Sequence, residues 1–208
     1  KQYQAFFSKP PTGASMDEVM FTRLRYGLLM PKLGQGAKQA AHWKDTLQLF
    51  EKSAKDNVPM SLAPAYVAQI KYMDAESQYE KFMAMKIAGP EKKMRDKDLG
   101  KFLLKQLTDK AKALKALEDT YIAIYKLGAA EYGLASLVKM GQAYENMSET
   151  LMKSYVPTNL TEEQRDFYTM GLADKAFPQV EKAVNQYKEA LRASFEANLY
   201  NADTDLAT

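Results

Sequence analysis

The sequence predicts an all-α fold built from about three lengthened antiparallel helix pairs. Good helix formers, above all Ala, Leu, Lys, Glu, Met and Gln, dominate the 208-residue chain, which holds only 10 glycines and 8 prolines. One helical spacing of apolar and small residues recurs after about 65 residues. In addition, we find no convincing strand pattern of alternating apolar and polar residues.

The first helix pair is expected at residues 15–55. Ser15 and Glu18 form a capping box, in which the hydroxyl and the carboxylate satisfy exposed amide donors at a helix start. Pro31 should end the first helix, because proline has no amide hydrogen to continue it. The preceding residues 1–13 hold two consecutive prolines and are expected to be extended.

The second helix pair is expected at residues 61–127. Ser61 is predicted to cap its first helix, which should end at the Gly89–Pro90 pair. Its second helix should end before Gly128, a residue suited to the left-handed backbone conformation just past a helix.

The third helix pair is expected at residues 130–199. Thr161 and Gln164 form a second capping box, and Pro178 predicts a kink in the helix that follows. Residues 200–208 are typical of the start of a further helix.

The recurring spacing has a leading and a trailing part. The leading part comprises Tyr72, Ala75, Glu76 and Tyr79, matched by Leu137, Met140, Gly141 and Tyr144. The trailing part comprises Leu117, Tyr121 and Ile124, matched by Ala183, Tyr187 and Ala190. A near-fixed period indicates stacked units that each bury an apolar face against the next. We therefore expect residues 1–208 to form a single helical-repeat domain, which favours a binding scaffold over an enzyme.

The spacing around Gly141 and Tyr187 resembles that of a tetratricopeptide (TPR) repeat. In that family a small residue on the first helix leaves a hole, which an aromatic side chain of the neighbouring helix fills. The period is nearly twice the roughly 34 residues of a TPR unit, so the resemblance implies a TPR-like α-solenoid with longer helices.

A string of short segments resembles the end module of large TPR proteins in the cell envelope of gliding and predatory bacteria. These segments are residues 129–135, 141–145, 156–157, 160–164, 175–178 and 199–201. The resemblance implies a role in a cell-envelope or gliding-motility assembly. The partner it implies is another protein, such as a motility-complex component or a small Ras-like GTPase.

The same resemblance implies which residues line a binding groove. In TPR proteins the first helix of each unit lines the concave face. Gln142, Glu145 and Asn146 would then face the groove in the later unit, and Lys71 and Gln78 in the earlier one.

Charge is unevenly distributed, although the net charge is only +3. Residues 91–115 carry nine basic and four acidic side chains, whereas residues 145–208 carry six basic and eleven acidic ones. The alternative function is therefore a basic adaptor that binds anionic lipid or nucleic acid through residues 92–115. Its candidate contacts are Lys92, Lys93, Arg95, Lys97, Lys101 and Lys105. Because acids are interleaved, a solvated face or protein-docking surface is favoured, and no nucleic-acid partner is expected.

No constellation typical of catalysis occurs in the sequence. His42 is the only histidine and there is no cysteine, so a typical zinc site is not expected. Glu76 and Glu80 lie one helical turn apart, but nearby lysines favour a solvated charged face over an acid–base pair. We predict no catalytic residues, no metal and no cofactor. The aromatic residues are expected in the interhelical core rather than in a base-stacking surface: Tyr121, Tyr125, Tyr132, Tyr144, Tyr187 and Phe195.

No run approaches the roughly 18 apolar residues that a transmembrane helix needs. The chain begins with Lys1 and shows no signal-peptide pattern, so we expect a mature or excised fragment. We expect a periplasmic or envelope-associated location, with the cytoplasm as the alternative.

Overall fold

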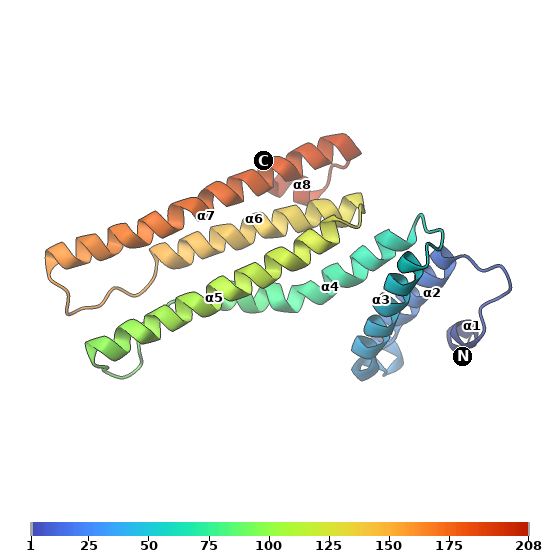
Figure 1. The fold of residues 1–208 in the computed structure, drawn as a ribbon, viewed down its shortest axis with the longest axis horizontal. Helices are drawn as coiled ribbons and strands as arrows, with labels where there is room; N and C mark the ends of the chain where they lie inside the picture. Colours follow the sequence, from blue (N-terminus) through green and yellow to red (C-terminus); the bar gives the residue numbers. More distant parts are fainter. Residues whose placement is uncertain (1, 208) are drawn as a thin grey trace.

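The computed structural model describes residues 2–207, and the side chains of all of these except Gln4 and Ser8. As predicted, the regular secondary structure within this range is all helical, with loops between the helices and no strand (Figure 1). The α-helices are α1 (Gln2–Ser8), α2 (Met16–Leu29), α3 (Gln39–Lys55), α4 (Ala63–Ala84), α5 (Asp96–Tyr125), α6 (Ala130–Met152), α7 (Glu162–Ala197) and α8 (Ala202–Ala207). Two short 3₁₀ turns, η1 (Pro31–Leu33) and η2 (Gly36–Lys38), join α2 to α3.

Both predicted capping boxes are present. The Glu18 amide donates to Ser15 Oγ (3.2 Å), and the Ser15 amide donates to Glu18 Oε2 (2.8 Å). Thr161 and Gln164 make the same reciprocal pair at the start of α7. Gly128 follows the end of α5 with a φ of +71°, a conformation in which a residue with a Cβ is strained. These local signals set the starts of α2 and α7 and the end of α5 as predicted. The predicted end of α4 at Gly89–Pro90 is wrong, because α4 ends at Ala84.

The predicted Ser61 cap of α4 is wrong, because a residue of α2 takes that role. The Asp17 carboxylate accepts hydrogen bonds from the backbone amides of Ser61 (3.1 Å), Leu62 (3.0 Å) and Ala63 (2.7 Å). The Ser61 hydroxyl also donates to Asp17 (2.7 Å) instead of accepting from α4. A charged acceptor satisfies several of the unpaired amides at the helix start and complements the positive end of the helix dipole.

The expectation of an extended N-terminal segment is also wrong for residues 2–8, which form α1. Its aromatic side chains account for the difference: the Tyr3 ring lies 5.7 Å, and the Phe7 ring 5.4 Å, from the Tyr26 ring of α2. The guanidinium of Arg23 lies 5.2 Å above the Phe7 ring. Burial of aromatic surface against α2 therefore stabilises a short helix that its sequence alone would not hold.

The helices follow one packing rule along the chain. α4 packs on α2 and α3, α6 packs on α4 and α5, and α8 packs on α6 and α7. Each odd-numbered helix from α3 to α7 packs on the even-numbered helix before it. In Figure 1, α5, α6 and α7 run side by side, whereas α2 and α3 stand at a steep angle to them. α6 lies at the centre of this arrangement.

Small residues allow the paired helices to approach closely. The Tyr187 ring of α7 lies so near Gly141 of α6 that a Cβ there would come within 2.5 Å of the ring. In the first pair the Trp43 ring of α3 occupies the corresponding space at Gly27 of α2. The same glycine–aromatic contact therefore occurs in two helix pairs, and the sequence interpretation identified it in only one.

The aromatic residues predicted for the core divide into two groups. Tyr121 and Tyr144 are buried, and Tyr132 and Tyr187 are half-buried. Two were wrongly assigned to the core: Tyr125 and Phe195 are exposed. Phe195 instead packs edge-on against the Tyr200 ring outside α7 (6.2 Å), and Tyr125 lies in the last turn of α5.

Candidate functional site

Two of the sequence-predicted groove residues on α6 connect that helix to its neighbours. Gln142 Oε1 accepts a hydrogen bond from the Tyr79 hydroxyl of α4 (2.8 Å). Glu145 Oε2 accepts one from the Tyr187 hydroxyl of α7 (2.6 Å). Burial raises the pKa of Tyr79 to about 12, so this hydroxyl keeps its proton and remains a donor at neutral pH. Gln142 is half-buried and Glu145 is exposed.

The third predicted α6 residue, Asn146, binds a buried lysine. Lys110 Nζ of α5 donates to Asn146 Oδ1 (2.6 Å) and to the backbone carbonyls of Phe82 (3.2 Å) and Met85 (2.7 Å). The ammonium also lies 4.4 Å above the Phe82 ring. Lys110 thus donates to two carbonyls at the end of α4, of which that of Phe82 also accepts from the Met85 amide (3.0 Å). Burial lowers its pKa to about 8.

The two predicted groove residues on α4 lie near a charged contact between α4 and α6. Lys71 is half-buried and Gln78 is exposed. Between them in sequence, Glu76 forms an ion pair with Lys139 of α6 (3.2 Å), and the Lys139 ammonium lies 3.9 Å above the Tyr79 ring. The contact between α4 and α6 therefore includes hydrogen-bonded and charged pairs beside its apolar core. Partner binding by the five predicted residues stays a prediction.

The predicted basic residues lie on the connector between α4 and α5 and on the first turns of α5, and all of them are exposed. Two are engaged in ion pairs within α5 or at its start: Arg95 with Asp98 (2.8 Å) and Lys105 with Asp109 (2.7 Å). The others are Lys92, Lys93, Lys97 and Lys101. Lys110, which the charge count included, is buried and cannot contribute to this surface. Binding of lipid or nucleic acid by the basic residues stays a prediction.

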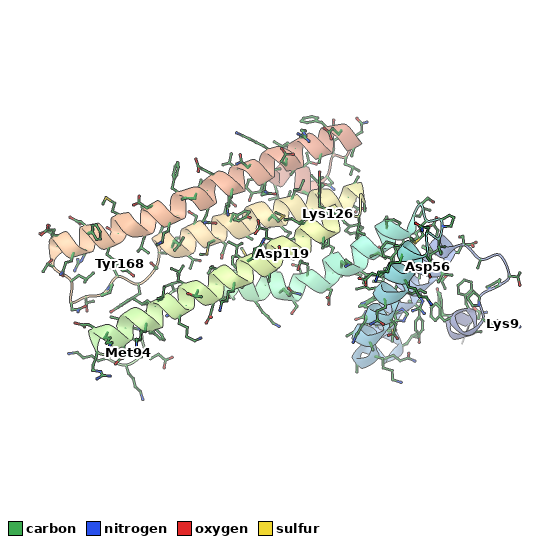
Figure 2. The ribbon with its side chains drawn as sticks, viewed as in Figure 1. Lys9, Asp56, Met94, Asp119, Lys126 and Tyr168 are labelled. Carbon is green, nitrogen blue, oxygen red and sulfur yellow. The ribbon has the colours of Figure 1, made fainter. Side chains whose placement is uncertain are left out.

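An apolar cleft of about 510 Å³ lies between the first halves of α5 and α7. We call it the leucine cleft. The end of α6 and the 153–161 loop also contribute to it, and Met94 and Tyr168 mark this end of the molecule in Figure 2. Its apolar lining residues are Ile87, Leu99, Leu103, Leu104, Leu107, Leu151, Pro157, Leu160, Phe167 and Leu172.

The leucine cleft is suited to bind apolar groups and offers little for chemistry. Two of its lining side chains, Leu104 and Phe167, are 62% and 74% exposed. Ser154 Oγ and the Tyr168 hydroxyl donate to backbone carbonyls, so they are already satisfied. The remaining polar lining residues are Asp96, Asn159, Gln164 and Lys175. A pocket lined mainly by apolar side chains with few polar ones is typical of binding sites.

The sequence interpretation did not single out the leucine cleft. The available signal was Leu104, which breaks the spacing of Leu99, Leu103 and Leu107 and therefore adds an apolar residue beside the buried face of α5. No signal in the sequence shows that α5 and α7 leave a space beyond the end of α6, because that depends on tertiary packing.

His42 is packed within an aromatic cluster. Its Nε2 donates to the Arg23 carbonyl (2.8 Å), and its ring lies 5.3 Å from that of Tyr26 and 5.2 Å from that of Trp43. Burial lowers its pKa, which favours the neutral imidazole. Within residues 2–207, no three His, Asp or Glu side chains lie in an arrangement that could hold a metal ion. Over the same range, no helix is both long and apolar enough to cross a membrane.

Comparisons of the chain with protein-family models, with curated proteins and with solved structures find no match.

Proposed function

We propose that the chain is a non-enzymatic protein-interaction scaffold, a TPR-like α-solenoid that belongs to a cell-envelope or gliding-motility assembly. Its partner is another protein, with a motility-complex component or a small Ras-like GTPase as the candidates. The proposed location is the periplasm or the envelope, with the cytoplasm as the alternative.

The solenoid part of the proposal is supported by the packing order of the helices. Each even-numbered helix packs on the pair before it, so contacts are limited to neighbours along one direction, as in repeat proteins. The close approach of Tyr187 to Gly141, and of Trp43 to Gly27, supports a common unit with a small residue facing an aromatic one.

Protein binding is supported above all by one observation, the exposure of Leu104 and Phe167 at the leucine cleft. Large apolar side chains that line a recess and remain open to water favour association with another apolar surface. We propose that the cleft accepts apolar side chains from a segment of the partner protein.

The test is a pull-down from envelope extracts of the source cell, at low and at high salt. The wild-type chain is compared with a Leu104→Glu/Phe167→Glu variant, whose substitutions should be tolerated because both side chains are exposed. We expect one dominant protein to bind the wild type at both salt concentrations, and its recovery to fall about tenfold or more with the variant, because carboxylates at the cleft oppose burial.

Leu33→Glu is the matched control, because Leu33 is also exposed and lies on η1, outside the cleft. It should retain the partner. Equal recovery with the cleft variant, at an unchanged melting temperature, would refute the cleft as the binding site. If the wild-type chain instead recovers only lipid or nucleic acid, and this binding is lost as salt rises, the basic residues 92–105 would be the binding site.

A further inference from the structure

The leucine cleft lies where α5 and α7 extend past the end of the helix between them. α6 contacts both neighbours, and Figure 1 shows that α5 and α7 run antiparallel to it. The Tyr187 ring lies against Gly141, so at equal rise Met152, the last residue of α6, lies opposite about Ala176. Residues 162–175 of α7 therefore extend about 21 Å beyond α6, at 1.5 Å per residue.

The start of α5 extends past α6 in the same way. Lys110 Nζ bonds to Asn146, which sets Met152 opposite about Leu104. Residues 96–103 of α5 therefore lie beyond α6. The terminal helices α1 and α8 lie away from this end of the molecule (Figure 1). The cleft is thus the continuation of the space that α6 fills between α5 and α7.

The faces that pack on α6 continue into the cleft. On α5, the cleft residue Leu107 lies three turns before Glu118 on the same side of the helix. Glu118 Oε1 accepts a hydrogen bond from the Tyr144 hydroxyl of α6 (2.9 Å). On α7, the cleft residue Leu172 lies one turn before Ala176, which is buried in a core cluster that also holds residues of α6. A helix seated in the cleft would therefore extend two packing surfaces that already hold a helix.

The floor of the cleft offers few partners to an extended peptide. Ser154 Oγ donates to the Leu151 carbonyl (2.8 Å), and the Tyr168 hydroxyl donates to the Tyr155 carbonyl (3.4 Å). The Tyr155 amide donates to the Ile87 carbonyl (3.0 Å). These groups are satisfied within the chain. An extended peptide needs backbone partners along its whole length, whereas the backbone groups of a helix bond to each other, so a helix fits this cleft better.

The α5 edge of the cleft is basic. Leu104, which is exposed, marks this edge, and Lys97 and Lys101 lie seven and three residues before it on the same side of α5. Both lysines are exposed. Residues 91–107 hold six basic and three acidic side chains, one of which, Asp96, lines the outer end of the cleft. Acidic side chains of an occupant would meet lysines at this edge.

The α7 edge is acidic. Phe167, which is exposed, marks this edge, and Glu163 and Asp174 lie four residues before and seven residues after it on the same side of α7. Both carboxylates are exposed. Residues 162–175 hold two basic and four acidic side chains, and the basic Lys175 lines the inner end of the cleft. The cleft therefore separates a basic edge from an acidic one.

We propose that the leucine cleft binds an amphipathic helix of the partner protein, about three turns long, with acidic side chains along one flank of its apolar stripe and basic side chains along the other. The acidic flank lies on Lys97 and Lys101, and the basic flank lies on Glu163 and Asp174. Three turns, about 16 Å, match the part of α7 that lines the cleft. This inference rests on the proposed function of the cleft and specifies the partner segment.

The experiment measures the binding of fluorescent 14-residue peptides to the full chain by fluorescence anisotropy. All peptides carry leucines at helical spacing. A mixed peptide has glutamates on one flank and lysines on the other, and two further peptides have only glutamates or only lysines on both flanks. We expect the mixed peptide to bind at least about fivefold more tightly than either of these, with the difference shrinking as salt is added.

The helical form of the occupant has its own control. A proline in the middle of the mixed peptide breaks a helix but is tolerated in an extended segment. The proline peptide should therefore bind at least about tenfold more weakly. Equal binding of the two peptides would overturn the helical occupant.

Charge reversal of one edge should change which peptide is preferred. In Lys97→Glu/Lys101→Glu both edges are acidic, so the all-lysine peptide should become the tightest binder. The matched control Lys112→Glu/Lys126→Glu reverses two exposed lysines outside the cleft and should keep the preference for the mixed peptide. An unchanged preference in the edge variant would overturn the charge arrangement.

The cleft variant Leu104→Glu/Phe167→Glu separates this inference from the proposed function. Loss of mixed-peptide binding in this variant, at an unchanged melting temperature, supports the inference. If all peptides bind the wild type equally and the cleft variant loses all of them, the charged flanks are overturned while the cleft remains an apolar binding site. If no peptide binds, but the cleft variant still loses the protein partner in the pull-down, the helical occupant is overturned and the proposed function stands. If neither peptides nor a protein partner depend on the cleft, both are overturned.

Discussion

At the scale of single residues, glycines determine how closely the paired helices approach. Gly27 and Gly141 lie under the rings of Trp43 and Tyr187, where any Cβ would collide with the ring. By contrast, a Cβ at Gly100 of α5 would meet no atom within 4 Å. Substitution by alanine should therefore change the stability of the chain in opposite directions at the two kinds of glycine.

We predict that Gly141→Ala destabilises the chain and that Gly100→Ala stabilises it. Overpacking against the Tyr187 ring costs roughly 1–3 kcal/mol, which exceeds the gain of up to about 1 kcal/mol from the better helix propensity of Ala. At Gly100 only that gain remains. Urea denaturation of the two variants measures the difference, and a stabilised Gly141→Ala protein would show that Tyr187 is free to move aside.

At the scale of helices, Asp17 joins the starts of two elements. It lies in the first turn of α2, yet its carboxylate accepts the amides of the first residues of α4. The hydrogen bond from the Ser61 side chain, followed by those from the backbone amides, lowers the Asp17 pKa. The orientation of α4 on α2 therefore depends on a charged acceptor.

We predict that Asp17→Asn costs about 1–2 kcal/mol at neutral pH, because the cap loses its charge. The folded-state pKa of Asp17 is depressed, so its stabilisation is present above the unfolded-state pKa of about 3.9 and is lost as pH falls through the folded-state pKa. The stability difference between wild type and Asp17→Asn should thus shrink between about pH 5 and pH 2. Denaturation across that range checks this, and a constant difference would contradict it.

The sequence alone predicts those structural features that depend on residues close together along the chain. The capping boxes at Ser15 and Thr161 involve groups within three positions of each other, so their residue types suffice to predict them. The cap of α4 required a carboxylate 44 residues earlier, and no local pattern identifies such a pairing.

At the candidate sites, too, local spacing is predictable from the sequence, whereas contacts between helices are not. Helical spacing placed Gln142 and Glu145 together on α6, but their hydroxyl partners, Tyr79 and Tyr187, are set by the packing of α4 and α7. The leucine cleft depends on where α5 and α7 lack a neighbouring helix between them. That information lies in the tertiary arrangement rather than in the periodicity of any one helix.

At the scale of the whole molecule, burial is concentrated in α6. This helix contacts α4, α5, α7 and α8, and 13 of its 23 residues are buried. α3 contacts chiefly α2 and α4, and only Thr46 and Ser53 of its residues are buried. A chain with such neighbour-limited contacts can open from its end without disrupting its centre.

We predict that backbone amides of α6 exchange with solvent most slowly and that those of α3 exchange faster. Hydrogen exchange followed by mass spectrometry checks this under native conditions. Equal protection of both helices, at the level of global unfolding, would instead indicate that all helix pairs unfold as one cooperative unit.

Lys110 restricts how α5 can shift along α4 and α6. Its ammonium is held at once by the end of α4, by Asn146 of α6 and by the Phe82 ring. A shift of α5 along α4 by a single turn, about 5.4 Å, would move the charge away from all of these acceptors and into contact with apolar side chains. Lys110 therefore ties the register of three helices to the contacts of one buried charge.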